Sequence, residues 1–546
     1  MEDIGLESTT EDDGPPEDLT YDLSDSPPAF QKFRSDPQQG AIRLPTDGRD
    51  NHRPMDSESQ RPGSVETVPA TVAVNLGEAP YHDPFWGSLF LICLGALFAT
   101  FFLVWLHTSD PGKVGDTIYN TLTRSGHLFA VDTVVAVIVS LVWLAAMQNY
   151  VRHLVTLIVV AVPIILFSFS VYPLVASYKG ATKGSSLQDR AMRWLSIIPG
   201  VLCIIWVYTL VKGRHALGKA IGILEFASKI LSANPALKFL GLGTLVVVVV
   251  WTWIWLGMFT RVFLGGHLST SVTKFILDAT SWWLAIYFVL MYIWSLGVIS
   301  GAQRATTAAT VSQWYFHRNA VPSPSSREVV GAALSHSTTT LFGTISLSTL
   351  IALLIRLPLL VLPTRLTRLI TLFAFSLIPT PIASLTNPLT LTYAAIHSQS
   401  LQPSARGLSQ MSFLHTDRPT TTLTPRSFNA RNRADSLLPY RLAKLILHAI
   451  RIVMATALGF GGWVATARQL AISEGAGIRG SAYAYVVGLV AGFIGWGVFG
   501  SLEGILSSIV DASVICWGSE RGMAGGGAYC LEAKTLFGEG REMEYP

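Results

Sequence analysis

The sequence predicts an all-α polytopic membrane protein of about ten transmembrane helices, preceded by a disordered acidic N-terminal tail. Two observations predict this fold class. Half of the 546 residues are hydrophobic and only 14% are charged, whereas a soluble chain carries about a quarter charged residues. Apolar stretches of about 20 residues, the length that crosses a bilayer as a helix, also recur from residue 87 onward. Such a chain could not cover itself with polar surface.

Residues 1–84 differ from the rest of the chain. They hold 18 acidic and 6 basic side chains, so the remainder of this net +4 chain is strongly basic. The tail contains proline-rich stretches such as GPPED and few apolar clusters, so it cannot bury enough surface to offset the entropy of folding. We expect a solvated cytosolic tail, with binding of a partner as the alternative.

The chain starts without the pattern of a cleaved signal peptide. Met1 opens an acidic stretch, whereas signal sequences begin with a basic segment followed by an apolar core. The apolar stretch near Gly87 is therefore expected to act as an uncleaved signal-anchor. The four cysteines show no CxxC or Cys/His spacing, so neither a metal site nor a disulfide framework is expected.

Residues 85–520 are predicted to form the transmembrane domain. The eighth stretch contains Pro379 and Pro381 and could be a broken or partly re-entrant helix, which neighbouring helices can tolerate by satisfying its freed backbone groups. The ten candidate spans are 87–106, 127–148, 153–176, 193–212, 236–260, 276–300, 329–355, 366–386, 443–469 and 481–513.

The distribution of Lys and Arg favours a cytosolic position for both termini. Basic residues are frequent in the connections that would then be cytosolic, including the stretch from Arg406 to Lys444. Within these connections, residues 216–235 have apolar residues at helical spacing and predict an amphipathic interfacial helix. Residues 405–435 are rich in Arg, Thr, Pro and Ser and are interpreted as a loop insertion, and 521–546 as a cytosolic C-terminal tail.

Ionisable residues inside the predicted spans are the first candidates for a functional role. A charge is costly in hydrocarbon, so such residues usually face a cavity or a partner and can carry a coupled ion or proton. Snorkelling to the interface is the alternative for the two that lie near span ends, and a satisfied core position is the alternative for the histidine. The candidates are Asp132, Asp278, Glu503, Asp511 and His336.

Aromatic clusters on two neighbouring spans are the second set of candidates. Stacked indole and phenol rings can hold a quaternary ammonium group by cation–π attraction. The alternative is an aromatic belt at the membrane interface, where Trp and Tyr are enriched. The candidates for substrate binding are Trp251 and Trp255 in the stretch WTWIW, and Trp282, Trp283 and Tyr287 in the stretch SWWLAIY.

Glycines within the spans are predicted to serve helix packing. Two small-xxx-small pairs follow each other at Gly488, Gly492, Gly500 and Gly504, and the stretch GFGGW begins at Gly459. Close approach of helix backbones explains such spacing, and a hinge for conformational change is the alternative. No hydrolase, P-loop, dinucleotide or metalloprotease pattern is present, so the sequence predicts neither an enzyme nor a cofactor, a metal or a nucleic-acid partner.

The stretch from Trp294 to Phe316 resembles a motif of the choline transporter-like family. In that family a Trp at the end of an apolar helix is followed by a Val-Ile pair, a segment rich in Thr, Ala and Gly, and an aromatic run. Further stretches that resemble the family are 336–356, 387–406 and 502–520. The matching residues of the motif are Trp294, Val298, Ile299, Thr306, Trp314, Tyr315 and Phe316.

This resemblance covers about residues 84 to 520, and the short loop between the first two predicted spans is similar to the fungal branch of the family. Gly301 stands where the family often has Asn, and Ala309 where Gly is usual. The resemblance implies a plasma-membrane carrier of choline or a related organic cation, working by alternating access and in exchange for protons. An uncoupled channel-like pathway and a non-transporting membrane organiser remain alternatives, and the oligomeric state stays open.

Overall fold

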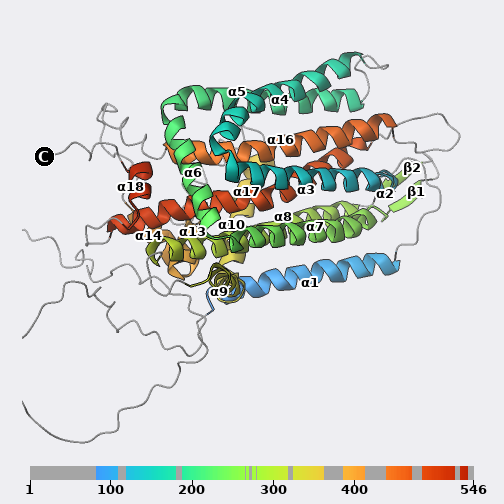
Figure 1. Cartoon of the computed structure of the whole chain (residues 1–546). Coiled ribbons are helices and arrows are strands. Elements are labelled where there is room, and N and C mark those ends of the chain that lie inside the picture. The colour runs from blue at the N-terminus through green and yellow to red at the C-terminus, as the bar shows by residue number, and fades with distance from the viewer. Residues whose placement is uncertain are drawn as a thin grey trace, which may run out of the picture.

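The computed structural model is a bundle of long helices that lie roughly alongside one another (Figure 1). The bundle is built from one chain, and most of the described residues lie in helices. The structure describes residues 81–107, 118–179, 187–264, 266–269, 274–277, 279–317, 324–361, 385, 387–411, 438–469, 483–522 and 529–538.

Eight helices in the described part of the chain are long and apolar enough to cross a membrane, or nine if one bent pair counts as a single span. This confirms the all-α membrane fold. The predicted span 366–386 lies almost entirely outside the described residues, so the count of ten stays a prediction. The long helices are α1 (Pro84–His107), α3 (Gly126–Asn149), α4 (Val151–Lys179), α5 (Leu187–Gly213), α7 (Ala236–Val262), α8 (Ala279–His317), α10 (Phe342–Val361), α16 (Leu438–Gln469) and α17 (Ala484–Gly522).

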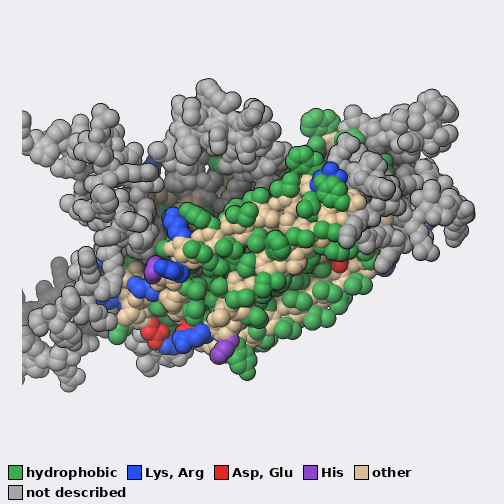
Figure 2. All heavy atoms as spheres, turned by 90° about the horizontal axis from the view of Figure 1, so that it is seen from above, with side chains coloured by type: hydrophobic (Ala, Val, Ile, Leu, Met, Phe, Trp, Pro, Cys, Tyr) green, Lys and Arg blue, Asp and Glu red, His purple; other side chains and the backbone are tan. Residues whose placement is uncertain are grey.

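The helix α17 lies at the centre of the bundle. Its most apolar stretch is 67% buried, compared with 11% for α1, and it packs against α16, α8, α3 and α7. The outer helices present large apolar side chains to their surroundings, and Figure 2 shows these covering the face in view while Lys and Arg gather mostly toward one end. An apolar outer surface of this kind is what a lipid environment requires.

A helical hairpin of α4 and α5 shows how a proline is accommodated at membrane depth. Pro163 inside α4 has no N–H, so the carbonyl of Val159, four residues earlier, loses its usual helical partner. The indole N–H of Trp206 on α5 lies 3.4 Å from this carbonyl and donates to it. A neighbouring helix thus supplies the hydrogen bond that the proline removes.

A sharp break separates α9 (Ser326–Thr338) from α10. The two axes differ by 66°, and the segment that precedes α1 packs into the break. The backbone N–H of His82 donates to the carbonyl of Thr340, and the Asp83 carboxylate accepts from the Thr344 hydroxyl at 2.9 Å. The predicted span 329–355 is therefore two helices rather than one. The sequence alone does not predict this break, because it does not show that residues 82 and 83 cap it.

Short helices gather at one end of the bundle, and a two-stranded sheet lies at the other (Figure 1). The predicted amphipathic stretch forms α6, whose apolar face packs on α16 and α17, and α14 continues up to Gln410 into the predicted loop insertion. These elements are η3 (Arg214–Ala216), α6 (Leu217–Ala233), α13 (Pro388–His397), α14 (Leu401–Gln410) and α18 (Leu531–Phe537), with α2 (Ile118–Arg124), β1 (Gly266–Ser269) and β2 (Lys274–Leu277) at the opposite end.

Candidate functional site

A cavity of about 540 Å³ lies among six helices, near the middle of α8 and the first half of α17. This volume falls in the range of about 300–1,000 Å³ that is typical of small-molecule sites. The helices α7, α8, α10, α16 and α17 form its walls. Pro388 and Leu391 of α13 also line it, and every residue of α13 from Leu389 to His397 is buried. The cavity is thus bounded by both long helices and a short buried one.

One wall of the cavity is aromatic. Tyr292 of α8 and Phe493 of α17 face each other edge to face, with ring centroids 6.4 Å apart. Behind Tyr292, the Trp255 ring of α7 stacks at 4.2 Å, and the Thr252 side chain lies 3.0 Å from the Tyr292 hydroxyl. Trp496 lies further along α17 and also lines the cavity. This wall could hold an organic cation against ring faces.

The charged side chains that line the cavity are Arg304 of α8 and Arg451 of α16. Arg451 donates from Nε to the carbonyl of Trp496 at 2.9 Å, and its guanidinium carbon lies 4.0 Å from the centre of the Trp496 ring. Arg451 also lies over Gly500, where a Cβ would come within 2.4 Å of the guanidinium carbon. The absence of a side chain at Gly500 therefore makes room for Arg451.

A ladder of ionisable side chains, in which the two acids are fully buried, joins α16 to α17 beside the cavity. Asp511 of α17 is fully buried and accepts from the Lys444 ammonium at 2.8 Å and from the Tyr440 hydroxyl at 2.7 Å. Glu503, two turns earlier on α17, is also fully buried. Its carboxylate lies 2.8 Å from His448 Nδ1 and 3.6 Å from an Arg451 terminal nitrogen. The structure thus brings two predicted acids into one network with bases of α16.

The other predicted ionisable residues lie apart from this network. Asp132 on α3 has one buried carboxylate oxygen without a hydrogen-bond partner in the described part of the chain. That oxygen faces Gly462 of α16, 3.6 Å from where a Cβ would stand. His336 lies at the break between α9 and α10, where its Nε2 is 2.9 Å from the Ser398 hydroxyl. Asp278 lies outside the described residues.

The predicted aromatic residues occupy three different places. Trp255 is buried behind the cavity wall and donates to the carbonyl of Phe288, while Trp251 donates to Ser295 at 2.6 Å. The hydroxyl of Tyr287 donates to the carbonyl of Cys93 on α1. Trp282 and Trp283 are 50% and 73% exposed near the start of α8. These five side chains therefore do not close on one another, and their role in binding stays a prediction.

The residues of the predicted motif connect α8 to its neighbours. Trp294 is buried against Phe90 of α1, with its indole N–H toward the carbonyl of Ser346. The hydroxyl of Thr306 lies 2.8 Å from that of Ser337. At the end of α8, Tyr315 is buried and donates to Glu520 of α17 at 2.5 Å. On either side of it, Trp314 meets Phe226, and Phe316 meets Tyr529.

Several residues of the site were not found by sequence reasoning. Tyr292, Phe493 and Trp496 lie in uniformly apolar stretches, where no periodicity distinguishes a cavity-facing position from a lipid-facing one. The basic residues of α16, in contrast, could have been predicted from the sequence. Lys444, His448 and Arg451 follow one another at helical spacing within a single span, so they share one face of the helix. A basic face in a span predicts an acidic partner helix.

These features define a multi-pass membrane protein whose helices surround a partly polar cavity, the arrangement of a transporter. A family model described as plasma-membrane choline transporter matches residues 197–521, more than half of the chain. Choline transporter-like protein ctl1 of Schizosaccharomyces pombe is 28% identical over 464 residues, which cover 84% of this chain and 76% of the relative. The chain belongs to the choline transporter family, as the motif around Trp294 predicted.

Proposed function

We propose that this protein carries choline or a related organic cation across the plasma membrane by alternating access. The observation that supports this most directly is the cavity of about 540 Å³ with an aromatic wall at the centre of a transporter fold. Phe493 is the ring best placed for a trimethylammonium head, because it lines the cavity and is partly exposed, whereas Tyr292 lines the cavity but is fully buried. Trp255 supports Tyr292 from behind. Trp251, Trp282, Trp283 and Tyr287 remain further candidates for contact with the cargo.

Alternating access requires one side of the cavity to close while the other opens. The short helix α13 is the candidate element that closes the cavity on the side where it lies. It is buried between α8 and α17, and two of its residues line the cavity. The break between α9 and α10 gives a neighbouring element in which a bend already exists. We infer that cargo release moves α13 and α10 away from α8.

Asp132 is the candidate for the exchanged proton. A proton carrier must alternate between a charged and a neutral form. Asp511 is paired with Lys444 and Glu503 lies 3.6 Å from Arg451, so neutralising either acid leaves a base of α16 without its partner. None of the ion pairs between described residues includes Asp132, so its protonation breaks no ion pair among them. His336 and Asp278 remain candidates of the same kind.

Uptake of radiolabelled choline into proteoliposomes of the purified full-length protein tests the proposal. We expect uptake well above that of empty liposomes, with a rate that depends on an imposed pH gradient. Asp132→Asn is expected to retain uptake but lose the response to the gradient. Uptake no greater than in empty liposomes, at every gradient tested, rejects choline as cargo, and uptake that ignores the gradient in the wild type favours an uncoupled pathway.

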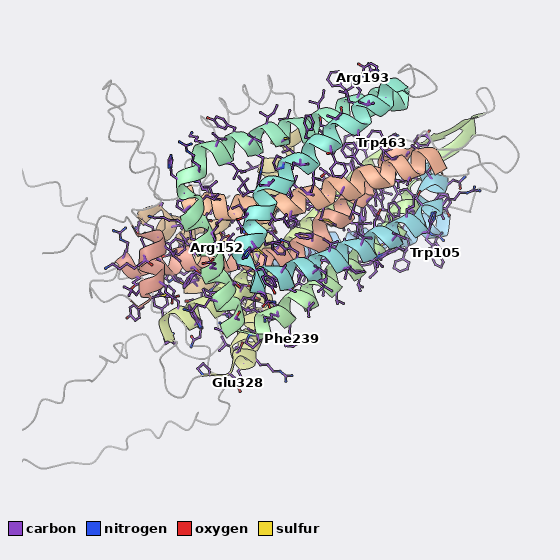
Figure 3. The ribbon with its side chains drawn as sticks, turned by 45° about the horizontal axis from the view of Figure 1, so that its top comes forward. Trp105, Arg152, Arg193, Phe239, Glu328 and Trp463 are labelled. Carbon is purple, nitrogen blue, oxygen red and sulfur yellow. The ribbon has the colours of Figure 1, made fainter. Side chains whose placement is uncertain are left out.

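Single substitutions test which of the aromatic candidates contacts the cargo. Trp282→Leu and Trp283→Leu each test whether a ring near the start of α8 meets the cargo, and a desolvated cation–π contact is worth about 1–2 kcal/mol. Trp105→Leu is the matched control, because Trp105 is exposed near the end of α1, away from the cavity (Figure 3). An affinity for choline equal to the control assigns Trp282 and Trp283 to lipid contact.

A further inference from the structure

The charged side chains that line the cavity are positive, whereas a simple cation would be attracted by negative ones. Both charged side chains that line it, Arg304 and Arg451, are basic, and no described Asp or Glu lines it. Arg451 has nearby partners in Glu503 and the carbonyl of Trp496. Arg304 is half-buried and has neither an ion pair nor a side-chain hydrogen bond within the described ranges. The cavity therefore holds positive charge that the described residues of its walls do not offset.

The helices around the cavity cannot supply the missing negative charge. Five of the six, namely α7, α8, α10, α13 and α16, contain no Asp or Glu. The acids of α17 are Glu503, Asp511 and Glu520, and each already contacts a base or a hydroxyl. The sequence from residue 329 to residue 416 also contains no acidic residue, although it includes several arginines. No carboxylate from this stretch can balance Arg304.

We infer that the cavity binds an oxyanion, a phosphate or carboxylate group, held by Arg304 and Arg451. The planar guanidinium group presents paired N–H donors that match the oxygens of phosphate and carboxylate. The electrostatic attraction is strong because most of the surrounding wall is apolar. The inference rests on the same cavity as the proposed function, but it does not require that choline crosses the membrane.

The neighbouring aromatic wall restricts the class of ligand further. Tyr292 and Phe493 line the cavity that Arg304 and Arg451 also line. A zwitterion that joins an oxyanion to a trimethylammonium group, such as phosphocholine, meets both walls at once. A plain anion meets only the arginines. The zwitterion is therefore expected to bind more tightly than inorganic phosphate, and choline more tightly in the presence of phosphate than alone.

Equilibrium binding of labelled inorganic phosphate and phosphocholine tests the inference. The full-length protein is purified in a maltoside detergent, which is uncharged and contains no phosphate. We expect saturable binding by the wild type and at least tenfold weaker binding by Arg304→Gln. Arg304→Lys keeps the charge but loses the paired donors, so it should be intermediate. Arg214→Gln is the matched control, because Arg214 is exposed in η3 and should bind as the wild type does.

A second arm distinguishes a free anion from a lipid phosphate. Nanodiscs with and without anionic phospholipid are compared by thermal unfolding. If neither soluble probe binds in detergent but anionic lipid stabilises the wild type and not Arg304→Gln, the oxyanion belongs to a lipid. Equal behaviour of wild type and Arg304→Gln in both arms overturns the inference. Size-exclusion profiles establish that Arg304→Gln is folded, and Arg304→Lys carries the comparison if it is not.

Choline uptake by the same preparations is scored separately. A protein that transports choline but shows no binding of an oxyanion that depends on Arg304 rejects this inference and leaves the proposed function standing. A protein that binds phosphocholine through Arg304 but does not transport choline supports this inference and rejects the proposed function. The two proposals therefore fail by different measurements.

Discussion

At the scale of single residues, the ion pair between Lys444 and Asp511 lies inside the bundle, where a charge without a partner is costly. Asp511 is fully buried and Lys444 is nearly so. Asp511→Asn removes the negative charge and leaves the Lys444 ammonium without its partner. Removing one partner of a buried ion pair typically costs about 3–5 kcal/mol. We expect a large fall in the thermal unfolding temperature of the purified protein, measured by intrinsic tryptophan fluorescence.

An exposed pair provides the control for this substitution. Arg152 and Glu225 lie 3.5 Å apart with both side chains open to solvent, and such pairs contribute about 0–1 kcal/mol. Glu225→Gln should therefore leave the unfolding temperature nearly unchanged. The double variant Lys444→Met with Asp511→Leu removes both charges and should recover much of the loss seen for Asp511→Asn. An Asp511→Asn protein as stable as Glu225→Gln would show that the buried pair is not formed.

The ion ladder shows what the sequence can and cannot predict about a site. Glu503 and Asp511 are predictable as functional candidates, since an acid in an apolar stretch is costly unless it is paired. Their partners are not, because Lys444 and His448 lie sixty or so residues away and meet the acids only through the crossing of two helices. Arg304 illustrates the same limit. Its position on α8 is evident, but its place in a cavity is set by the neighbouring helices.

At the scale of elements, the contact of α16 with α17 depends on glycine. A Cβ at Gly488 would stand 2.7 Å from the carbonyl oxygen of Gly459 and 2.7 Å from the Cβ of Trp463. Both neighbours belong to the body of α16, so neither can move alone. This confirms close backbone approach at Gly488, as the spacing of small residues predicted.

Gly488→Ala is expected to destabilise the protein. The added methyl group must push the two helices apart, and overpacking of this kind costs about 1–3 kcal/mol. Gly461→Ala is the matched control on α16, because Gly461 is exposed and nothing lies within 4 Å of its added Cβ. That substitution should be neutral or slightly stabilising, since alanine favours a helix. Equal unfolding temperatures for the two variants would contradict a close crossing at Gly488.

The elements differ in how well the sequence predicts them. The eight helices that are each long and apolar enough to cross a membrane follow from apolar length alone. The bend between α9 and α10 does not, because no proline or glycine stands at residues 339–341. Its geometry depends on His82 and Asp83, which are more than 250 residues earlier in the chain. The buried position of α13 is likewise set by its packing on α8 and α17 rather than by its own sequence.

At the scale of the whole molecule, the arrangement of the elements predicts an even number of crossings. The start of α1 and the helix α18 lie at the same end of the bundle, and the β1–β2 sheet lies at the opposite end (Figure 1). The end with α18 also carries Arg214, Lys219 and Lys229, and a Lys and Arg excess marks the cytosolic side. Both termini are therefore expected in the cytosol and the sheet outside the cell.

Cysteine labelling in intact cells tests this topology. In a protein whose four native cysteines are replaced, one cysteine is introduced either at Ser269 of β1 or at Thr535 of α18. A membrane-impermeant maleimide should label position 269 directly, and position 535 only after permeabilisation, because the two positions lie at opposite ends of the bundle. Labelling of position 535 alone in intact cells would invert the orientation. Labelling of both positions in intact cells would contradict this topology, because α18 and the sheet would then lie on the same side of the membrane.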